Sequence, residues 1–289
     1  MRIRKAVLPV AGLGTRVLPA TKVVPKELLP IVDKPTLQYI VEEAVAAEIE
    51  EIIFVTSRSK RAIEDHFDSF PELEQTLREK KKLKELEELR EIQSVAAYAT
   101  VRQAEPLGLG HAVLCAKHLV GDEPFVVMLG DEFMAKETPC LSRLIEVYEK
   151  YSSSVLTLFT VREDQVSSYG IAEVKELAPE VFQVLNLVEK PPLEEAPSRL
   201  AIAGRYILTP DIFELIEKTP KGRGGEIQLT DAIKVQAQAG RCYGIHFTGD
   251  RYDMGTPLGL LTTSIAFALQ RPDIAPELRE YMREALKEK

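Results

Sequence analysis

The sequence of 289 residues has no tryptophan, one asparagine and three cysteines. Cys115, Cys140 and Cys242 are widely separated and form no Cys-x-x-Cys pair, so they read as reduced residues of a cytosolic protein rather than as a disulfide framework. Apolar runs fall well short of the roughly 18 residues that a membrane span needs. We therefore predict a soluble, cytoplasmic protein, and we expect no export signal because Pro9 and Arg16 interrupt the first apolar run.

The sequence also lacks the features of several classes of function. A net charge of −8 argues against a nucleic acid polymer as partner, because phosphate backbones are bound through basic surfaces. The four histidines show no ligand-like spacing, which gives no reason to expect zinc. No Ser-His-Asp or Cys-His arrangement suggests a nucleophile. The length suits one large α/β domain or two small ones.

The segment from Lys5 to Pro35 is the most informative stretch. Its apolar run, Ala6–Ala11, predicts a buried strand that ends in a turn, Gly12–Gly14, where bare main-chain N–H groups can approach a ligand. A hydroxyl and three cations follow the turn, at Thr15, Arg16, Lys22 and Lys26. A main-chain turn followed by cations suits a polyphosphate, whereas a surface turn with incidental charges is the alternative.

Two common phosphate loops do not fit this segment. The string G-x-x-x-x-G-K-[ST] is absent, and the dinucleotide fingerprint would need a glycine in place of Val17. Pro19 and Pro25 prevent a long helix directly after the turn, so a phosphate held by a helix N-terminus is not expected. We predict a long loop that wraps its ligand.

The strings AGLGTR at Ala11–Arg16 and VPKELLPIVDKP at Val24–Pro35 resemble the sugar-1-phosphate nucleotidyltransferases, and within them the bacterial UTP–glucose-1-phosphate uridylyltransferases. The resemblance implies UTP and glucose 1-phosphate as substrates, and UDP-glucose and pyrophosphate as products. It implies Mg²⁺ as cofactor and a Rossmann-like, three-layer α/β fold of GT-A type. We expect a mixed, mostly parallel central sheet with a smaller antiparallel addition.

The first half of the chain predicts alternating helices and strands. A helix is expected after Pro35, followed by a buried strand at Ile52–Thr56, which together open a parallel sheet. The charged stretch Pro71–Gln93 is predicted to form one helix, either solvated with one packed face or packed against another subunit. The next strand is expected at Val95–Val101. Because ligands bind at the carboxyl ends of such strands, the turn after Val10 lies on the expected functional edge.

A glutamine and several glycines follow the strand that ends at Val101. Gln103 can pair with the donor and acceptor edge of a pyrimidine, and Gly108 permits close approach of the main chain, although a glutamine here also suits a loop-tethering amide. The resemblance implies that this segment contacts the uracil. Asp131 follows the apolar strand Phe125–Leu129, where a carboxylate needs a cation such as Mg²⁺ unless it caps the following turn.

The second half predicts antiparallel strands and a sugar-phosphate site. Strands are expected at 155–161, 169–174, 181–188, 201–208 and 242–248, and Thr230 is expected to cap a helix beginning near Asp231. Glu189 and Lys190 suit the hydroxyls and the phosphate of a sugar phosphate, or form a surface ion pair. The GGEIQLTDA string suits a mobile loop or a plain linker. The resemblance implies that sugar-phosphate contacts come from Gly170, Glu189, Lys190, Gly204 and Glu226.

The last part of the chain adds a second aspartate. Asp253 with Gly255 resembles the D-x-G of the nucleotidyltransferases, in which this aspartate lies near the metal, but Thr256 and Pro257 depart from the usual pattern and leave its contacts open. Terminal helices are expected at 256–270 and 275–287, packed on the sheet or on a neighbouring subunit. We predict one domain, with a nucleotide-binding half at 1–150, a sugar-phosphate-binding half at 151–255 and C-terminal helices at 256–289. A homo-oligomer, dimer or tetramer, is also expected.

The implied reaction is attack of glucose 1-phosphate on the α-phosphorus of UTP. The resemblance implies that Ala11, Gly12, Gly14, Thr15, Gln103 and Gly108 bind the nucleotide. Arg16, Lys26 and Asp131 are predicted to be catalytic, and Asp131 with Asp253 to hold the metal. Alternatives are thymidylyl transfer to the same sugar phosphate, a non-catalytic nucleotide sensor, and a dinucleotide-dependent oxidoreductase, which the missing third glycine disfavours.

Overall fold

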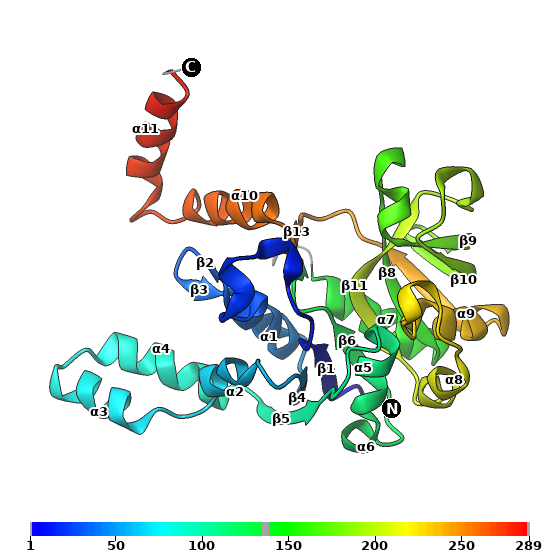
Figure 1. Cartoon of the computed structure of the whole chain (residues 1–289), viewed down its shortest axis with the longest axis horizontal. Helices are drawn as coiled ribbons and strands as arrows, with labels where there is room; N and C mark the ends of the chain where they lie inside the picture. Colours follow the sequence, from blue (N-terminus) through cyan, green and yellow to red (C-terminus); the bar gives the residue numbers. More distant parts are fainter. Residues whose placement is uncertain (1, 135–138, 288–289) are drawn as a thin grey trace.

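The computed structural model describes residues 2–134 and 139–287. Within these residues, nine strands form one sheet in the order β5-β4-β1-β6-β11-β8-β12-β10-β9 (Figure 1). Its strands are β1 (Lys5–Pro9), β4 (Glu51–Thr56), β5 (Ala97–Arg102), β6 (Phe125–Met128), β8 (Ser154–Thr160), β9 (Gly170–Ala178), β10 (Val181–Glu189), β11 (Leu200–Leu208) and β12 (Cys242–His246). Two small ladders pair β2 (Pro30–Ile31) with β3 (Lys34–Pro35) and β7 (Glu132–Met134) with β13 (Arg251–Asp253).

The sheet is mixed, as predicted, but parallel pairs are not in the majority. The neighbours β5–β4, β4–β1, β1–β6 and β8–β12 are parallel, and β6–β11, β11–β8, β12–β10 and β10–β9 are antiparallel. The antiparallel strands continue the same sheet, because β11 pairs with β6 at the end of the parallel part. Because β1, β4 and β6 are parallel, their carboxyl ends lie at one edge of the sheet, and the opening loop and Asp131 follow there.

Apolar side chains on the two faces of the sheet pack against different helices. Ala6 and Leu8 belong to one buried cluster and Val7 to another, as expected for alternate residues of a strand. The first cluster includes residues of α1 (Thr36–Ala46) and α7 (Cys140–Tyr151). The second includes residues of α5 (Leu109–Cys115), α8 (Ile212–Lys218) and α9 (Leu229–Gln238). The remaining helices are α2 (Arg61–Phe67), α3 (Pro71–Glu79), α4 (Leu83–Ser94), α6 (Lys117–Val120), α10 (Pro257–Ala268) and α11 (Ala275–Ala285).

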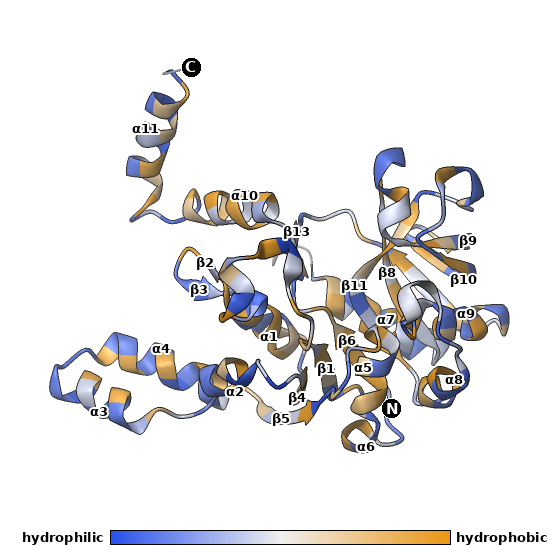
Figure 2. Cartoon of the chain, in the orientation of Figure 1, coloured by the Kyte–Doolittle hydropathy of each residue, from blue (hydrophilic) through white to orange (hydrophobic). Residues whose placement is uncertain are grey.

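The prediction of one helix over Pro71–Gln93 is wrong, because the stretch forms a hairpin of α3 and α4. The chain turns at three consecutive lysines, and Lys81 has a φ of 58°, which is outside the right-handed helical region. Arg90 of α4 donates to Glu74 of α3 at 2.9 Å and joins the two helices. The hairpin extends from the body of the protein and is mostly polar, with apolar residues scattered along it (Figure 2).

Several predicted boundaries move by a few residues. β1 ends at Pro9 rather than Ala11. Helix α9 begins at Leu229 with Gln228 as its N-cap residue, so Thr230 is not the cap and lies in the first turn. Helix α10 is capped by Thr256, whose hydroxyl accepts from the Gly259 amide at 3.1 Å. None of the helices in the described residues is both long enough and apolar enough to cross a membrane.

Candidate active site

The opening loop between β1 and β2 is shaped by three short 3-10 helices, at Thr15–Val17, Ala20–Lys22 and Lys26–Leu28. Gly14 has a φ of +66°, and a Cβ on it would lie 3.3 Å from the Cβ atoms of Thr21 and Lys26. The Thr21 hydroxyl donates to the Gly14 carbonyl at 2.7 Å. Glycine at this position therefore lets the loop fold back on Lys26. Gly12 and Thr15 are exposed on the loop.

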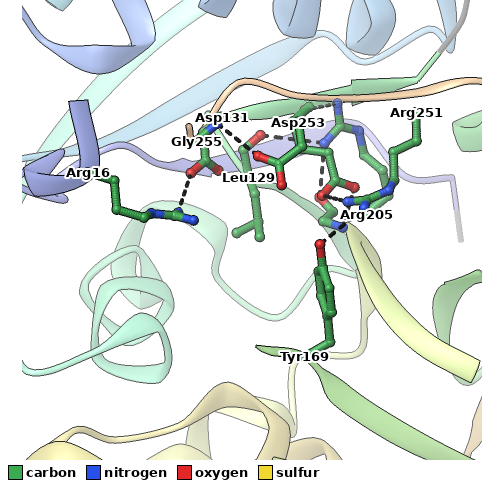
Figure 3. A network of polar contacts seen from close by, with 10 residues as sticks. Arg16, Leu129, Asp131, Tyr169, Arg205, Arg251, Asp253 and Gly255 are labelled. Atoms are coloured by element: carbon green, nitrogen blue, oxygen red, sulfur yellow. Dashed lines mark hydrogen bonds and ion pairs between the residues drawn. The ribbon is translucent and has the colours of Figure 1, made fainter. Parts of the chain in front are cut away.

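Two cations of the opening loop meet one carboxylate. The Lys26 Nζ lies 2.5 Å from the Asp131 Oδ2, and an Arg16 Nη lies 3.7 Å from the same oxygen. Figure 3 shows Arg16 extending toward Asp131. Burial of the Asp131 carboxyl would raise its pKa, but the charges of Lys26 and Arg16 outweigh burial and lower the pKa below its ordinary value. Asp131 is therefore an anion at neutral pH.

Asp253 is brought beside Asp131 by the ladder of β7 and β13. The Met254 amide donates to the Asp131 carbonyl at 2.7 Å, and the Asp253 carboxylate accepts from the Gly255 amide at 2.8 Å. A Cβ on Gly255 would lie 2.8 Å from an Arg16 Nη, so the guanidinium of Arg16 lies against this glycine. We call Arg16, Lys26, Asp131 and Asp253 the opening-loop cluster, and Figure 3 labels Arg16, Asp131 and Asp253.

The carboxylates of the opening-loop cluster suit a Mg²⁺ ion whose remaining ligands are substrate phosphates and water. The described residues contain no group of three or more His, Cys, Asp or Glu side chains suited to a metal. Asp131 and Asp253 nevertheless supply two carboxylates near the same Arg16 guanidinium. Mg²⁺ is commonly held by one or two carboxylates when substrate phosphates and water complete its coordination.

The predicted sugar-phosphate residues meet where β10 ends. Glu189 pairs in register with Gly170, and a Cβ on Gly170 would lie 3.1 Å from the Glu189 Oε2. The same oxygen accepts from the Thr230 hydroxyl at 2.8 Å, and the Glu189 Oε1 lies 3.0 Å from the Lys190 Nζ. Lys190 has a φ of 47°, which directs the chain sharply away from the strand. We call Gly170, Glu189, Lys190 and Thr230 the strand-end corner.

Hydrogen bonds and packing connect the strand-end corner to the opening-loop cluster. The Lys190 amide donates to the Tyr169 carbonyl at 3.0 Å, and the Tyr169 hydroxyl accepts from Arg251 at 3.2 Å. Arg251 donates to Glu132 at 2.6 Å, and Glu132 follows Asp131 in the chain. Figure 3 shows the Arg251 side chain reaching from the right toward the hydroxyl of Tyr169, which lies below Asp253. The two predicted halves of the site are therefore linked through one set of contacts.

The segments of Gln103 and Glu226 pack directly against each other. The Ile227 amide donates to the Leu107 carbonyl at 2.7 Å, and the Gly110 amide donates to the Ile227 carbonyl at 2.9 Å. A Cβ on Gly108 would lie 2.8 Å from the Cβ of Glu226, so this glycine is needed for close packing of the protein with itself. The Glu226 residue is exposed.

Gln103 has the tethering contacts that its alternative interpretation predicted. Its amide nitrogen donates to the Gly108 carbonyl at 3.1 Å and lies 3.0 Å from the His111 Nδ1. Gly204 likewise has internal partners, because its amide donates to Glu132 at 3.0 Å and its carbonyl accepts from Leu129 at 2.9 Å. A Cβ on Gly204 would lie 2.8 Å from the Cβ of Leu129. The ligand contacts of Gln103 and Gly204 stay predictions.

A model of the nucleotidyl transferase family matches residues 5–268. The chain belongs to this family. It is 51% identical over 281 residues to a UTP–glucose-1-phosphate uridylyltransferase of Bacillus subtilis, with 97% of this chain and 96% of that protein covered. A solved structure of a UTP-bound UGPase from Acinetobacter baumannii is 42% identical, with a TM-score of 0.90 and coverage of 98% and 99%. A UDP-glucose pyrophosphorylase complexed with UDP-glucose is 42% identical, with a TM-score of 0.85 and coverage of 93% and 100%.

The nucleotidyl transferase contains a buried network that the sequence did not reveal. Arg205 is fully buried and donates twice to the Glu43 carboxylate, at 2.9 and 2.7 Å, and to the Glu132 carbonyl at 2.8 Å. Glu132 accepts from Gly204 and Arg251, and Arg251 lies 3.9 Å from the centre of the Phe159 ring. We call Glu43, Glu132, Arg205 and Arg251 the buried network. A single charge within the apolar run LAIAGRYIL was the available signal for Arg205.

Proposed function

We propose that this chain transfers the uridylyl group of UTP to glucose 1-phosphate and releases UDP-glucose and pyrophosphate. The observation that carries the proposal is the meeting of Arg16 and Lys26 at Asp131, at 3.7 and 2.5 Å, where the opening loop follows a central strand. This arrangement occurs in a chain 51% identical to a protein named for that reaction. The similar solved structures include a UTP-bound UGPase and a UDP-glucose pyrophosphorylase complexed with UDP-glucose.

The chemistry needs charge neutralisation and alignment more than proton transfer. A phosphate oxygen of glucose 1-phosphate forms a bond to the α-phosphorus of UTP, and the bond from this phosphorus to the bridging oxygen breaks. The leaving pyrophosphate keeps that electron pair. Because the attacking oxygen is already an anion near neutral pH, no general base is needed.

The opening loop supplies the groups for the triphosphate. Main-chain N–H groups of Gly12, Gly14 and Thr15 would bind phosphate oxygens, as such groups do in anion-binding turns. Arg16 would neutralise the departing pyrophosphate, and Lys26 would stabilise the charge that develops on the α-phosphate. Ala11 in this loop, with Gln103 and Gly108 from the segment after β5, would contact the base.

The strand-end corner supplies the groups for the sugar phosphate. Lys190 would bind the phosphate of glucose 1-phosphate, and Glu189 would accept hydrogen bonds from sugar hydroxyls. Glu226 would contribute a second carboxylate from the loop that packs on Gly108. Gly170 and Gly204 would lie beside the sugar, and at both positions a Cβ would also meet protein atoms, so packing within the protein requires glycine there as well.

Asp131 and Asp253 would hold Mg²⁺ with the substrate phosphates. When bound, Mg²⁺ neutralises phosphate charge and orients the reacting groups. Lys26 must leave Asp131 to reach a phosphate, and a lone carboxylate at this partly buried position would then need another cation. The ion pair between Lys26 and Asp131 therefore supports a site in which both groups exchange partners as ligands bind.

We also assign a Rossmann-like, three-layer fold of GT-A type, with residues 1–150 as the nucleotide half, 151–255 as the sugar-phosphate half and 256–289 as C-terminal helices. A homo-oligomer, dimer or tetramer, is part of the proposal. Large apolar side chains are exposed on α10, on α11 and directly after α11, including Leu258, Leu261, Tyr281 and Leu286 at 59 to 75% exposure. Light scattering of the purified protein would give the mass of the assembly, and a monomer would contradict this part.

The catalytic proposal is tested by pyrophosphate release from UTP and glucose 1-phosphate, with UDP-glucose identified by mass spectrometry. The same assay is run with dTTP to separate uridylyl from thymidylyl transfer. We expect the higher kcat/KM with UTP. A higher value with dTTP would move the assignment to thymidylyl transfer, and binding of UTP without pyrophosphate release would indicate a nucleotide sensor.

A further inference from the structure

A second acid–base pair lies directly behind the opening-loop cluster. The Lys60 Nζ lies 2.6 Å from the Glu27 Oε2, and the two side chains are 5% and 1% exposed. Glu27 follows Lys26 in the 3-10 helix Lys26–Leu28. Lys60 precedes α2 in the segment that follows β4, so it comes from a separate part of the chain.

Stability alone does not account for this pair. Removing two charges from water is costly, and their attraction recovers that cost only when the remaining polar atoms are also satisfied. The Glu27 Oε1 is buried and has no hydrogen-bond partner in the part of the chain that the structure describes. Burial raises the pKa of Glu27, against the charges of Lys60 and Lys26, which lower it. The pair therefore has features better explained by a positional role.

Glu27 is adjacent in the chain to Lys26 and packs on the residue that precedes Asp131. Consecutive residues of a 3-10 helix point about 120° apart, so inward placement of Glu27 directs Lys26 elsewhere. A Cβ on Gly130 would lie 3.0 Å from the Glu27 Cγ, which means that the Glu27 side chain packs on the residue before Asp131. Glu27 thus fixes the main chain next to Lys26 and next to Asp131.

Lys60 itself is firmly held. Its amide donates to the Ser57 carbonyl at 3.1 Å, and its carbonyl accepts from the Ile63 amide at 3.0 Å. Ile63 is fully buried in the cluster that α1 also contacts. Lys60 can therefore transmit the position of β4 and α2 to the opening loop through Glu27.

We propose that Lys60 is a positioning residue that, through its buried ion pair with Glu27, keeps Lys26 aligned while Lys26 exchanges Asp131 for a substrate phosphate. The expected effect of Lys60 on turnover rests on the proposed function, whereas its effect on the position of Lys26 does not. Lys26 loses its own link to the protein when it leaves Asp131, whereas the link between Glu27 and Lys60 stays in place. Lys60 itself would not touch the substrates.

The test compares the single variant Lys60→Met with the double variant Glu27→Leu/Lys60→Met. The single variant leaves an unpaired buried carboxylate, so we expect it to lose both stability and turnover. The double variant replaces the pair with apolar groups of similar size, so its urea midpoint should return toward wild type. Its kcat should stay about 10- to 100-fold low with little change in KM, because misplacement of a catalytic group by about 1 Å costs turnover.

A labelling measurement separates this proposal from the proposed function. In the ligand-free protein, Lys26 has a 17% exposed side chain and an ion pair, so it should react slowly with an amine-acetylating reagent. Acetylation of Lys26 should become several-fold faster in the double variant, while exposed Lys84 reacts unchanged. A double variant with wild-type kcat and wild-type Lys26 labelling would overturn the positioning role. Changed labelling in a protein that lacks uridylyl transfer would support the positioning and contradict only the proposed function.

Discussion

Asp131 and Glu132 are consecutive residues, but their carboxylates have different surroundings. Asp131 belongs to the opening-loop cluster and Glu132 to the buried network. Asp131 faces Lys26 and Arg16, and the Arg16 side chain is 63% exposed. Glu132 is buried and accepts from Gly204 and Arg251 at 3.0 and 2.6 Å. The pKa of Asp131 is lowered by its two cations despite burial, whereas burial raises the pKa of Glu132 despite Arg251.

The comparison shows how one chain can hold exchangeable charges on a fixed support. The opening-loop cluster joins two cations of a loop to Asp131, and these pairs can separate when a ligand arrives because the ligand's own cation then meets the Asp131 carboxylate. The buried network pairs groups from strands and from α1, where loss of one partner leaves an uncompensated charge.

Arg205→Met should give the largest change, a loss of about 3 to 5 kcal/mol in the free energy of unfolding, because it removes a fully buried guanidinium and leaves the partly buried Glu43 carboxylate without its partner. Urea denaturation followed by circular dichroism would measure this. Arg205→Lys is the matched variant, since it retains the charge but cannot make the forked contact with Glu43. A loss below about 1 kcal/mol for Arg205→Met would place the network among weak surface pairs and remove the contrast drawn above.

Lys26→Ala should act on the barrier to reaction rather than on the fold. We expect kcat to fall about 10²- to 10³-fold, or roughly 3 to 4 kcal/mol, because a charge that stabilises the transition state is lost. Steady-state kinetics with UTP and glucose 1-phosphate would give the ratio, and circular dichroism would check folding. Lys84→Ala, which changes an exposed lysine on α4, is the control. Turnover near that of the control would refute the role of Lys26.

Local motifs made the opening-loop cluster predictable. Gly14, Arg16 and Lys26 lie within one segment, where spacing and residue type carry the physical requirement for a phosphate turn. Asp131 was predictable because a carboxylate directly after a buried strand needs a cation. The mixed sheet was also expected, although the balance of parallel and antiparallel pairs depends on the place of β11 beside β6, which no local pattern encodes.

The buried network and the Lys60 pair depend on contacts between distant parts of the chain. Arg205 and Glu43 are 162 positions apart, and a single sequence does not show that they meet. Lys60 likewise reads as one more charge before a helix until Glu27 is placed beside it. The helical hairpin of α3 and α4 was missed because a polar stretch with regular leucines suits one helix as well as two, and the turn at Lys81 has no glycine or proline to mark it.

Acidification should change the folding stability in opposite directions through Asp131 and through Glu132. The folded pKa of Asp131 is below its ordinary value near 3.8, so its contribution to stability is present above that value and is lost as the pH falls through the folded pKa. Glu132, whose pKa is raised, acts in the opposite direction, because protonation is easier in the folded state. From neutral pH to about pH 3, wild type should therefore lose more stability than Asp131→Asn, as measured by urea midpoints. Equal losses would mean that Asp131 is not held by its cations.

The smallest change in stability is expected for an ion pair that is exposed to solvent. Lys218 lies 3.7 Å from Glu214 on α8, and the two side chains are 75% and 72% exposed. Lys218→Ala should alter the free energy of unfolding by only about 0.2 to 0.5 kcal/mol, because solvent screens the pair and its side chains stay mobile. Urea denaturation in low and high salt would measure it. A loss approaching that of Arg205→Met would show that burial does not decide what an ion pair contributes in this protein, and the distinction between exchangeable and fixed charges would then need another physical basis.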